Sequence, residues 1–289
     1  MQGDAVGLAL LAAGYFGLAL VLTQFGLRSV PPLQGAAVSV TTTAVAFLSA
    51  SPLLVGWSAA TWPAVLVFVA IGALFPVAVT MLTFRANQRL GPHVAGALGN
   101  LAPLFAVLLA AALLGEVPGW GQAAGVVVVV AGATILALAS ARGVGVAAWG
   151  ALLLPLAAAL IRGTVQPAVK IGFETWPDPF AAATIGYAVS AVVVLALAGA
   201  RGGLSLSRSN PRGLLWFAAV GLCNGAALVT MYAALARGPV ALVAPLVATY
   251  PIATLVFGGL FLRGARIGPR VVLGVAVTVA GVAMLLATR

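Results

Sequence analysis

The stretch Gly125-Val-Val-Val-Val-Val-Ala-Gly-Ala-Thr-Ile-Leu-Ala-Leu138 occurs a second time near the end of the chain, as Gly274-Val-Ala-Val-Thr-Val-Ala-Gly-Val-Ala-Met-Leu-Leu-Ala287. The two copies are identical at 7 of 14 positions. Because valine and alanine are abundant throughout the chain, the matched glycines carry more weight than the matched aliphatic residues. Self-similarity at a long spacing indicates an internal repeat, so the stretch predicts a chain built from two related halves.

Features upstream of each copy occur in the same order. Leu90-Gly-Pro92 corresponds to Arg237-Gly-Pro239, and each of these turns is followed by an apolar run with an internal proline, Pro103 or Pro251. The glycine and proline positions thus repeat together, as they would if one structural unit occurred twice.

The composition places the chain in lipid. Hydrophobic residues make up 63% of the 289 residues and charged residues only 6%, whereas a soluble domain carries about 25% charged residues. A helix needs about 20 apolar residues to span the hydrocarbon of a bilayer. Ten runs of roughly that length occur, at residues 5–25, 34–56, 63–84, 94–114, 119–140, 146–169, 179–199, 213–236, 240–262 and 269–287.

Each half, 1–142 and 143–289, contains five of these runs. An odd number of crossings makes the second half enter the membrane from the opposite face. The sequence therefore predicts an all-α membrane protein with ten transmembrane helices in two inverted five-helix repeats. Transporters with inverted repeats hold the substrate near the bilayer midplane and open to either side in turn, so we expect alternating access at a central cavity.

Short motifs within this framework resemble those of the drug/metabolite transporter superfamily, specifically its ten-helix permeases with two EamA-type halves. An aromatic-x-Ala pattern occurs at Phe84-Arg-Ala86 and at Tyr232-Ala-Ala234. Leu113-Leu-Gly-Glu116 closes the fourth run, and a Gly-x-x-x-x-x-x-Gly spacing occurs in each fifth run. The resemblance extends over the whole chain.

The chain departs from the family pattern at three places. The second half has Phe261-Leu-Arg-Gly264 where the family usually has Leu-Gly-Glu. The Trp-Gly pair of each first helix is replaced by Phe16-Gly17 and Arg162-Gly163. The basic residue that usually follows in that helix is Lys170 in the second half but Gln24 in the first.

The resemblance implies an exporter or bidirectional carrier of small metabolites, such as amino acids or similar amphipathic solutes. A lipid flippase or a passive channel of the same fold is the alternative. One histidine and four acidic residues, the acids all at run ends or in loops, cannot assemble a His-Asp dyad or a metal triad near the midplane. We therefore expect no enzymatic activity, no cofactor and no metal site.

The expected partners are a small-molecule substrate and the lipid bilayer, and the expected state is a monomer, with a dimer as the alternative. The net charge of +10 does not indicate nucleic-acid binding, because the basic residues are dispersed between apolar runs and form no aromatic-basic motif. Dispersed arginines of this kind anchor helix ends at anionic headgroups.

Polar residues inside the runs are costly to insert into lipid and usually have a function. Arg162 lies near the centre of its run, and Gln166 and Lys170 follow on the same helical face. We interpret this stripe as a positively charged wall of the cavity that receives a carboxylate or another anionic group. The alternative is an arginine that snorkels, or that bonds carbonyls freed by Pro155 and Pro167.

Helix interruptions at corresponding positions of two halves mark the binding sites of transporters. Pro103 and Pro251 are therefore the candidate gating positions. Asn100 and Tyr250, close before these prolines, are candidate substrate ligands, and Tyr15 is a further one. The alternatives are a bond from Asn100 across helices and ordinary aromatic packing of Tyr250.

Small residues elsewhere predict close helix packing. The run Thr41-Thr-Thr43, together with Ser39, has this character, as does the pair Gly221 and Gly225.

Coupling to protons has one candidate, His93, because no Asp or Glu lies within a run. Uncoupled transport and exchange are the alternatives.

Ten crossings place both termini on one side of the cell (inner or plasma) membrane. The positive-inside rule puts them outside, because ten of the fourteen basic residues follow odd-numbered runs, whereas the family resemblance implies cytoplasmic termini.

Overall fold

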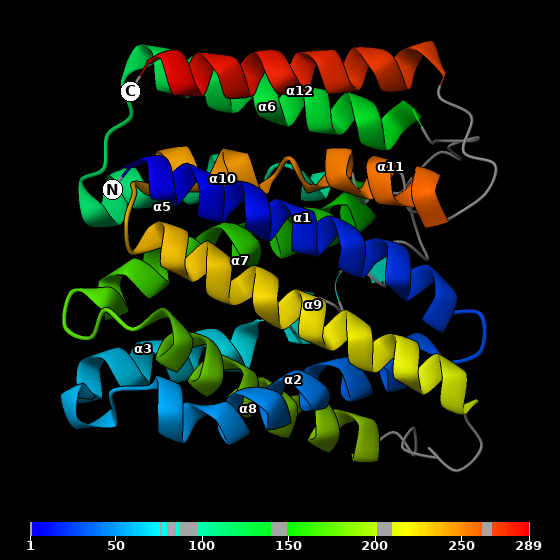
Figure 1. The fold of residues 1–289 in the computed structure, drawn as a ribbon. Helices are drawn as coiled ribbons and strands as arrows, with labels where there is room; N and C mark the ends of the chain where they lie inside the picture. Colours follow the sequence, from blue (N-terminus) through cyan, green and yellow to red (C-terminus); the bar gives the residue numbers. More distant parts are fainter. Residues whose placement is uncertain are drawn as a thin grey trace.

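The computed structural model describes residues 2–75, 77–79, 82, 85–86, 98–139, 149–200, 210–261 and 268–288. Within these ranges every regular element is a helix, and the helices form a bundle that runs broadly along one direction (Figure 1). They are α1 (Gln2–Gly26), α2 (Pro32–Leu54), the 3-10 helix η1 (Trp57–Ala59), α3 (Trp62–Leu74), α5 (Ala102–Leu114), α6 (Trp120–Ala139), α7 (Trp149–Phe173), α8 (Pro179–Ala200), α9 (Pro211–Leu235), α10 (Val240–Val247), α11 (Tyr250–Phe261) and α12 (Pro269–Ala287).

Eight helical segments of the described chain are long and apolar enough to cross a membrane, and α5 and part of α6 (Trp120–Ile135) are shorter apolar helices. Large apolar side chains cover the outside of the bundle, where Leu53, Trp120 and Leu260 are exposed. Such a surface is unsuited to water and suited to lipid.

The apolar run 240–262 forms two helices rather than one. α10 ends at Val247, residues Ala248 and Thr249 form a turn, and α11 begins at Tyr250. Pro251 explains the break, because a proline has no N–H to donate and fits the first turn of a helix better than its interior. The run 94–114 is interrupted in the same way, with a turn at Asn100 and Leu101 before Pro103 in α5.

The packing of the two halves follows one pattern. α1 of the first half packs on α9 and α11, and its counterpart α7 packs on α3 and α5. Glycines make both contacts close. A Cβ added at Gly17 would lie 2.6 Å from the Cβ of Ala253 in α11, and one added at Gly163 would lie 2.6 Å from the Cβ of Phe105 in α5.

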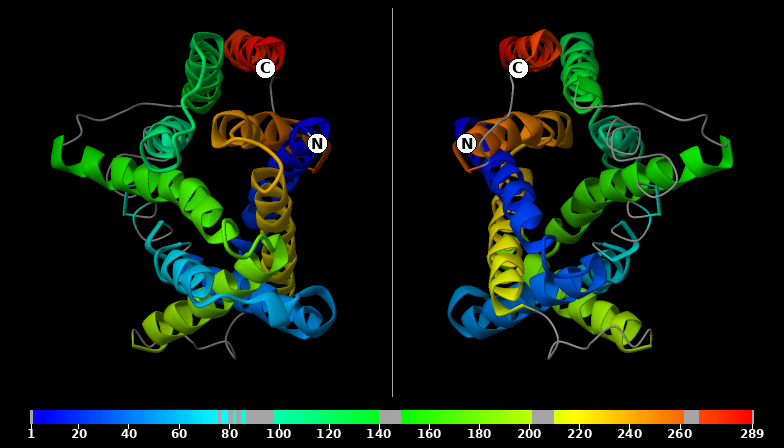
Figure 2. Two further views of the ribbon diagram at one scale, coloured as in Figure 1. Left: turned by 90° about the vertical axis from the view of Figure 1, so that its left-hand side faces the viewer. Right: turned by 90° about the vertical axis from the view of Figure 1, so that its right-hand side faces the viewer.

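The fifth helices of the two halves, α6 and α12, pack against each other in opposite directions. A Cβ added at Gly132 would lie 2.5 Å from the backbone nitrogen of Thr278, and one added at Gly281 would lie 2.6 Å from that of Val129. Residue numbers thus rise along one helix as they fall along the other. Views along the bundle show this pair at one edge and α2 with α8 at the opposite edge (Figure 2).

The contact between α2 and α9 confirms the prediction of close packing by small residues. Gly221 lies against the carbonyl oxygen of Ser39, closer than a Cβ would permit. A Cβ added at Gly225 would lie 2.5 Å from the Cγ2 of Thr43. Any larger side chain at these glycines would push the two helices apart.

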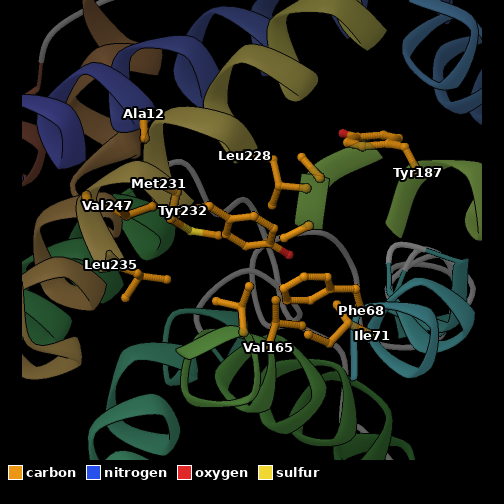
Figure 3. Close-up of a cluster of buried hydrophobic side chains, with 14 of the residues drawn as sticks. Ala12, Phe68, Ile71, Val165, Tyr187, Leu228, Met231, Tyr232, Leu235 and Val247 are labelled. Carbon is orange, nitrogen blue, oxygen red and sulfur yellow. The ribbon is translucent and has the colours of Figure 1, made fainter. Parts of the chain in front are cut away.

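The buried core lies between the halves and is rich in aromatic residues. Phe173 of α7 packs edge-on against Phe68 of α3 and Tyr232 of α9, with ring centroids 6.0 and 6.3 Å apart. Trp176, which follows α7, contacts Phe68 at 6.1 Å. Figure 3 shows the ring of Tyr232 extending from α9 toward Phe68 and Val165 on the other side of the core.

Both chain ends lie at the same end of the bundle, which we call the terminal end (Figure 1). α1 begins at this end, and α5, α7 and α12 finish there. We call the other end, where α1 and α11 finish and α9 and α12 begin, the opposite end. The two ends correspond to the two faces that a membrane-spanning bundle presents to water.

Candidate functional site

Arg162 occupies the middle of α7, as the fourteenth of its 25 residues. At about 1.5 Å of rise per residue, the guanidinium-bearing residue lies roughly 16–20 Å from either end of the helix. α7 is continuous from Trp149 to Phe173 although it contains Pro155 and Pro167. Arg162 is therefore placed at mid-depth by a long, unbroken helix.

The guanidinium lies beside the break that precedes α5. Its Nη1 atom would be 3.8 Å from a Cβ added at Gly99. The neighbouring Gly163 makes this approach possible, since an added Cβ there would lie 2.8 Å from the carbonyl oxygen of Ala102 in α5. Because Pro103 has no N–H, the carbonyl of Gly99 lacks its usual helical donor, so the arginine stands next to a turn with incomplete helical bonding.

Asn100 and Tyr250 are brought together, although 150 residues separate them. The Tyr250 hydroxyl donates to the Oδ1 atom of Asn100 over 3.3 Å. The Asn100 Nδ2 atom donates to the carbonyl of Ala133 in α6 over 2.9 Å, and Asn100 is buried. The bond across helices is therefore present, and it uses one donor and one acceptor of the amide. One N–H and one lone pair of the amide remain for another partner.

The two helix breaks are equivalent in detail. Pro103 is the second residue of α5 and Pro251 is the second residue of α11, and each follows a turn of two residues. Both new helices therefore begin next to the Asn100–Tyr250 contact. Pro103 and Pro251 have no N–H, and the N–H groups of Leu104 and Ile252 donate to the carbonyls of Leu101 and Thr249. What the two helix starts add to the charge of Arg162 is therefore the partial positive charge of a helix N-terminus.

Gln166 lies one turn beyond Arg162 on α7, and its Oε1 atom is buried without a hydrogen-bond partner among the described residues. Buried amide oxygens are normally bonded. This acceptor is therefore available to a donor from a bound solute or a water molecule.

Lys170, the last residue of the predicted stripe, has partners of its own. Its Nζ atom forms an ion pair with Glu116 and donates to the carbonyl of Gly238 over 3.1 Å. The second carboxylate oxygen of Glu116 accepts from the backbone N–H of Val240 over 2.7 Å, at the first residue of α10. The sequence placed Glu116 at the end of the fourth run but did not indicate the ion pair, because the partners are 54 positions apart in the chain.

The remaining candidates are not joined to this group of residues. Tyr15 is half-buried at the middle of α1, and no hydrogen bond between described residues links it to Asn100 or Tyr250. His93 lies outside the described residues. Within the described chain there is also no cluster of three His, Cys, Asp or Glu side chains that could hold a metal ion.

The arrangement combines one fixed cation with several neutral hydrogen-bonding groups at mid-depth between the halves. Arg162 supplies the charge, and Asn100, Tyr250 and Gln166 supply donors and acceptors. Groups of this kind bind and orient a polar solute. None of these four side chains is a carboxylate or an imidazole, and what they offer a solute is charge complementarity and hydrogen bonding.

A solved structure matches the fold, and a family model matches the sequence. A crystal structure of a protein with 24% sequence identity superposes with a TM-score of 0.83, covering 100% of this chain and 99% of that one. No curated protein matches the chain. The model of the EamA-like transporter family matches twice, at residues 4–138 and 148–287. These two matches take in nearly the whole chain and confirm the resemblance found in the motifs. The chain therefore belongs to the EamA-like transporter family.

Proposed function

We propose that this protein is a ten-helix carrier that moves a small solute with a carboxylate or another anionic group across the membrane by alternating access. Family membership indicates a multi-pass membrane protein that transports small solutes. The observation that carries the narrower proposal is the position of Arg162, at mid-depth in α7 and beside the break that precedes α5.

The proposed ten crossings comprise the eight long segments together with α5 and α6. We take 1–142 and 143–289 as the two inverted repeats. The antiparallel contact of α6 with α12 supports this arrangement, because an axis that exchanges two equivalent antiparallel helices is perpendicular to both. If these helices cross the membrane, that axis lies in the membrane plane.

An arginine at the bilayer centre costs about 2.5–3.5 kcal/mol on insertion scales. None of the four carboxylates lies at its depth: Asp4 begins α1, Glu116 follows α5, and Glu174 and Asp178 lie between α7 and α8. A solute carboxylate can bind the planar guanidinium through two parallel hydrogen bonds. Such a solute would bring a negative charge to this depth.

The neutral groups around Arg162 narrow the substrate class further. The free Gln166 oxygen and the remaining lone pair of Asn100 can accept hydrogen bonds from a solute ammonium or hydroxyl group. Val165, three residues after Arg162 on α7, belongs to the apolar core. An amphipathic zwitterion such as an amino acid fits this combination, with export or bidirectional exchange as the mode of transport.

The other partner is the bilayer of the cell membrane. We place both termini on its cytoplasmic face, as the family resemblance implies, and expect a monomer.

Purified protein in proteoliposomes tests the proposal against a panel of amino acids, nucleosides and cationic drugs. We expect uptake of zwitterionic or acidic solutes by the wild type. Arg162→Ala should abolish that uptake and can spare cationic solutes. Arg237→Ala is the matched control, because Arg237 is exposed at the end of α9, outside this site.

Two outcomes would contradict the proposal. One is uptake of anionic and zwitterionic solutes that is unchanged in Arg162→Ala. The other is movement of fluorescent lipid between leaflets with no solute transport, which would identify a flippase.

A further inference from the structure

We propose that the ion pair of Glu116 with Lys170 is a one-sided lock, which holds the terminal end of the transporter closed and has no counterpart at the opposite end. The proposal rests on alternating access, as put forward above. Its residues lie outside the Arg162 group and are not part of the proposed substrate contacts.

The lock joins the two halves through four groups. Glu116 belongs to the first half, while Lys170, Gly238 and Val240 belong to the second. Gly115 has φ of 68°, in the left-handed region that glycine adopts readily, and it turns the chain so that Glu116 follows directly after α5. The carboxylate therefore reaches both the last turn of α7 and the first residue of α10.

The environment makes this pair stronger than an ordinary surface ion pair. The side chains of Lys170 and Glu116 are only 21% and 20% exposed. Partly buried pairs are screened less by water and salt, and each charge here also has a backbone partner. Removing one charge would leave the other half-buried and uncompensated.

Opening of the terminal end would have to break the lock. In transporters with inverted repeats, one half rocks or gates against the other around a fixed site. Glu116 would then separate from Lys170 or from the start of α10. Among the described residues the other contacts between the halves at this end are not ion pairs: the hydroxyls of Thr61 and Thr175 are 2.8 Å apart, and Trp57 packs on Trp176.

The internal repeat shows that the opposite end lacks the equivalent pair. The position of Lys170 corresponds to Gln24, and Leu113-Leu-Gly-Glu116 corresponds to Phe261-Leu-Arg-Gly264. Both members of the pair are thus replaced by residues that cannot form it. No Asp or Glu occurs between Asp4 and Glu116 or after Asp178, so no neighbouring carboxylate can take over the role.

Aromatic and apolar contacts hold the opposite end instead. Phe25 of α1 stacks on Trp216 of α9 with ring centroids 5.0 Å apart. A Cβ added at Gly26 would lie 2.7 Å from the ring of Phe217. These contacts can slide and reform without separating charges. The lock therefore biases the transporter toward the state in which the terminal end is closed.

Cross-linking of cysteine pairs measures the two ends separately. The reporter pair at the terminal end is Thr61→Cys with Thr175→Cys. The pair at the opposite end is Ser29→Cys with Arg212→Cys. Both positions are exposed, and Ser29 lies against Gly213, the neighbour of Arg212. Each pair is introduced into a Cys223→Ala background, and rates are measured in proteoliposomes with a short thiol cross-linker.

Glu116→Gln removes the charge but keeps an acceptor for Val240. We expect cross-linking at the terminal end to slow by about fivefold or more, the lower range of conformational coupling, and cross-linking at the opposite end to become faster. Glu174→Gln is the control, because Glu174 is exposed at the same end and forms no ion pair among the described residues. Glu116→Asp retains the charge. Its cross-linking rates should equal those of the wild type or lie between those of the wild type and Glu116→Gln.

Unchanged rates at both ends in Glu116→Gln would overturn the proposal, even if the melting temperature fell. Slower cross-linking at both ends would overturn it too, since that result indicates a loosened fold. Lys170→Met should reproduce the effect of Glu116→Gln, and the double variant should add little to either. These readouts need no substrate, so they are independent of the transport assay that tests Arg162.

Discussion

The hydroxyl of Tyr250 donates to the side-chain oxygen of Asn100 over 3.3 Å, and this bond connects the helix break of one half to the helix break of the other. Asn100 is also held within its own half by the carbonyl of Ala133. A movement of one half relative to the other must therefore stretch or break the bond with Tyr250. Asn100 and Tyr250, which belong to the proposed site, therefore form a contact that changes when the two halves move relative to each other.

Removing this bond should weaken the protein in a graded way. Tyr250→Phe deletes one hydroxyl and should cost about 0.5–1.5 kcal/mol, the net value of a typical hydrogen bond. Asn100→Ala removes both side-chain bonds of the amide and leaves the Tyr250 hydroxyl without its acceptor, and should cost about 1–3 kcal/mol or more. Melting temperatures in detergent should therefore fall further for Asn100→Ala. A larger fall for Tyr250→Phe would argue against the bond, and Tyr15→Phe serves as the control.

The prolines at the breaks should matter more for turnover than for assembly. Pro103→Ala and Pro251→Ala each restore an N–H that could extend the helix backward through the turn. We expect expression close to that of the wild type and a clearly lower transport rate per molecule in proteoliposomes. Pro52→Ala is a useful comparison, since Pro52 lies within α2 near its end, away from the breaks. Unchanged transport in both variants would leave the breaks without a role in opening.

Lysine at position 162 should separate charge from geometry. Arg162→Lys keeps the positive charge but cannot form the planar pair of hydrogen bonds to a carboxylate. We expect a raised apparent KM for zwitterionic or acidic solutes and a melting temperature close to that of the wild type. If Arg162 instead holds the helix break in place, both Arg162→Lys and Arg162→Ala should lower the melting temperature, whichever solute is present. Measuring both quantities on one preparation distinguishes the two roles.

Matched glycines should be equally sensitive to added volume. Gly17→Val and Gly163→Val each force a side chain into the backbone of the facing helix, where even a Cβ would be 2.9 Å or less from backbone atoms. We expect large losses of folded protein for both, of about 1–3 kcal/mol or more by analogy with the cost of overpacked cores. Gly14→Val is the control, since a Cβ at Gly14 would meet no neighbouring atom within 4 Å. A mild effect at Gly163 alone would show that the two contacts are not equivalent.

The helices and their repeat could be predicted from the sequence because both depend on local composition. Long apolar runs require helices in lipid, and Gly125, Gly132 and Gly281 of the repeated stretch lie at close contacts between α6 and α12. The turns before Pro103 and Pro251 followed from the chemistry of proline. What local pattern could not supply was the number of helices in the run 240–262, which depends on where the turn closes.

The site was only partly accessible to the same reasoning. Arg162 could be placed at mid-depth by counting residues, and Asn100 and Tyr250 by their nearness to prolines. The pairing of Asn100 with Tyr250, and of Glu116 with Lys170, is a matter of three-dimensional packing between segments far apart in the chain. Tyr15 had the same depth in its helix as Arg162, but no hydrogen bond between described residues joins it to Asn100 or Tyr250. Depth along a helix does not determine which way a side chain points.

The seam between α6 and α12 makes each of its contacts twice, with Gly132 against Thr278 and Gly281 against Val129. Two separate copies of a half-length chain, inserted in opposite orientations, would reproduce such a seam by symmetry alone. In such a pair of separate copies one substitution would alter both faces of the membrane at once. Joining the copies into one chain removes this restraint. Lys170 can then keep its acidic partner while Gln24 has none. Substitutions in one half can thus change the contacts at one face of the membrane without changing those at the other.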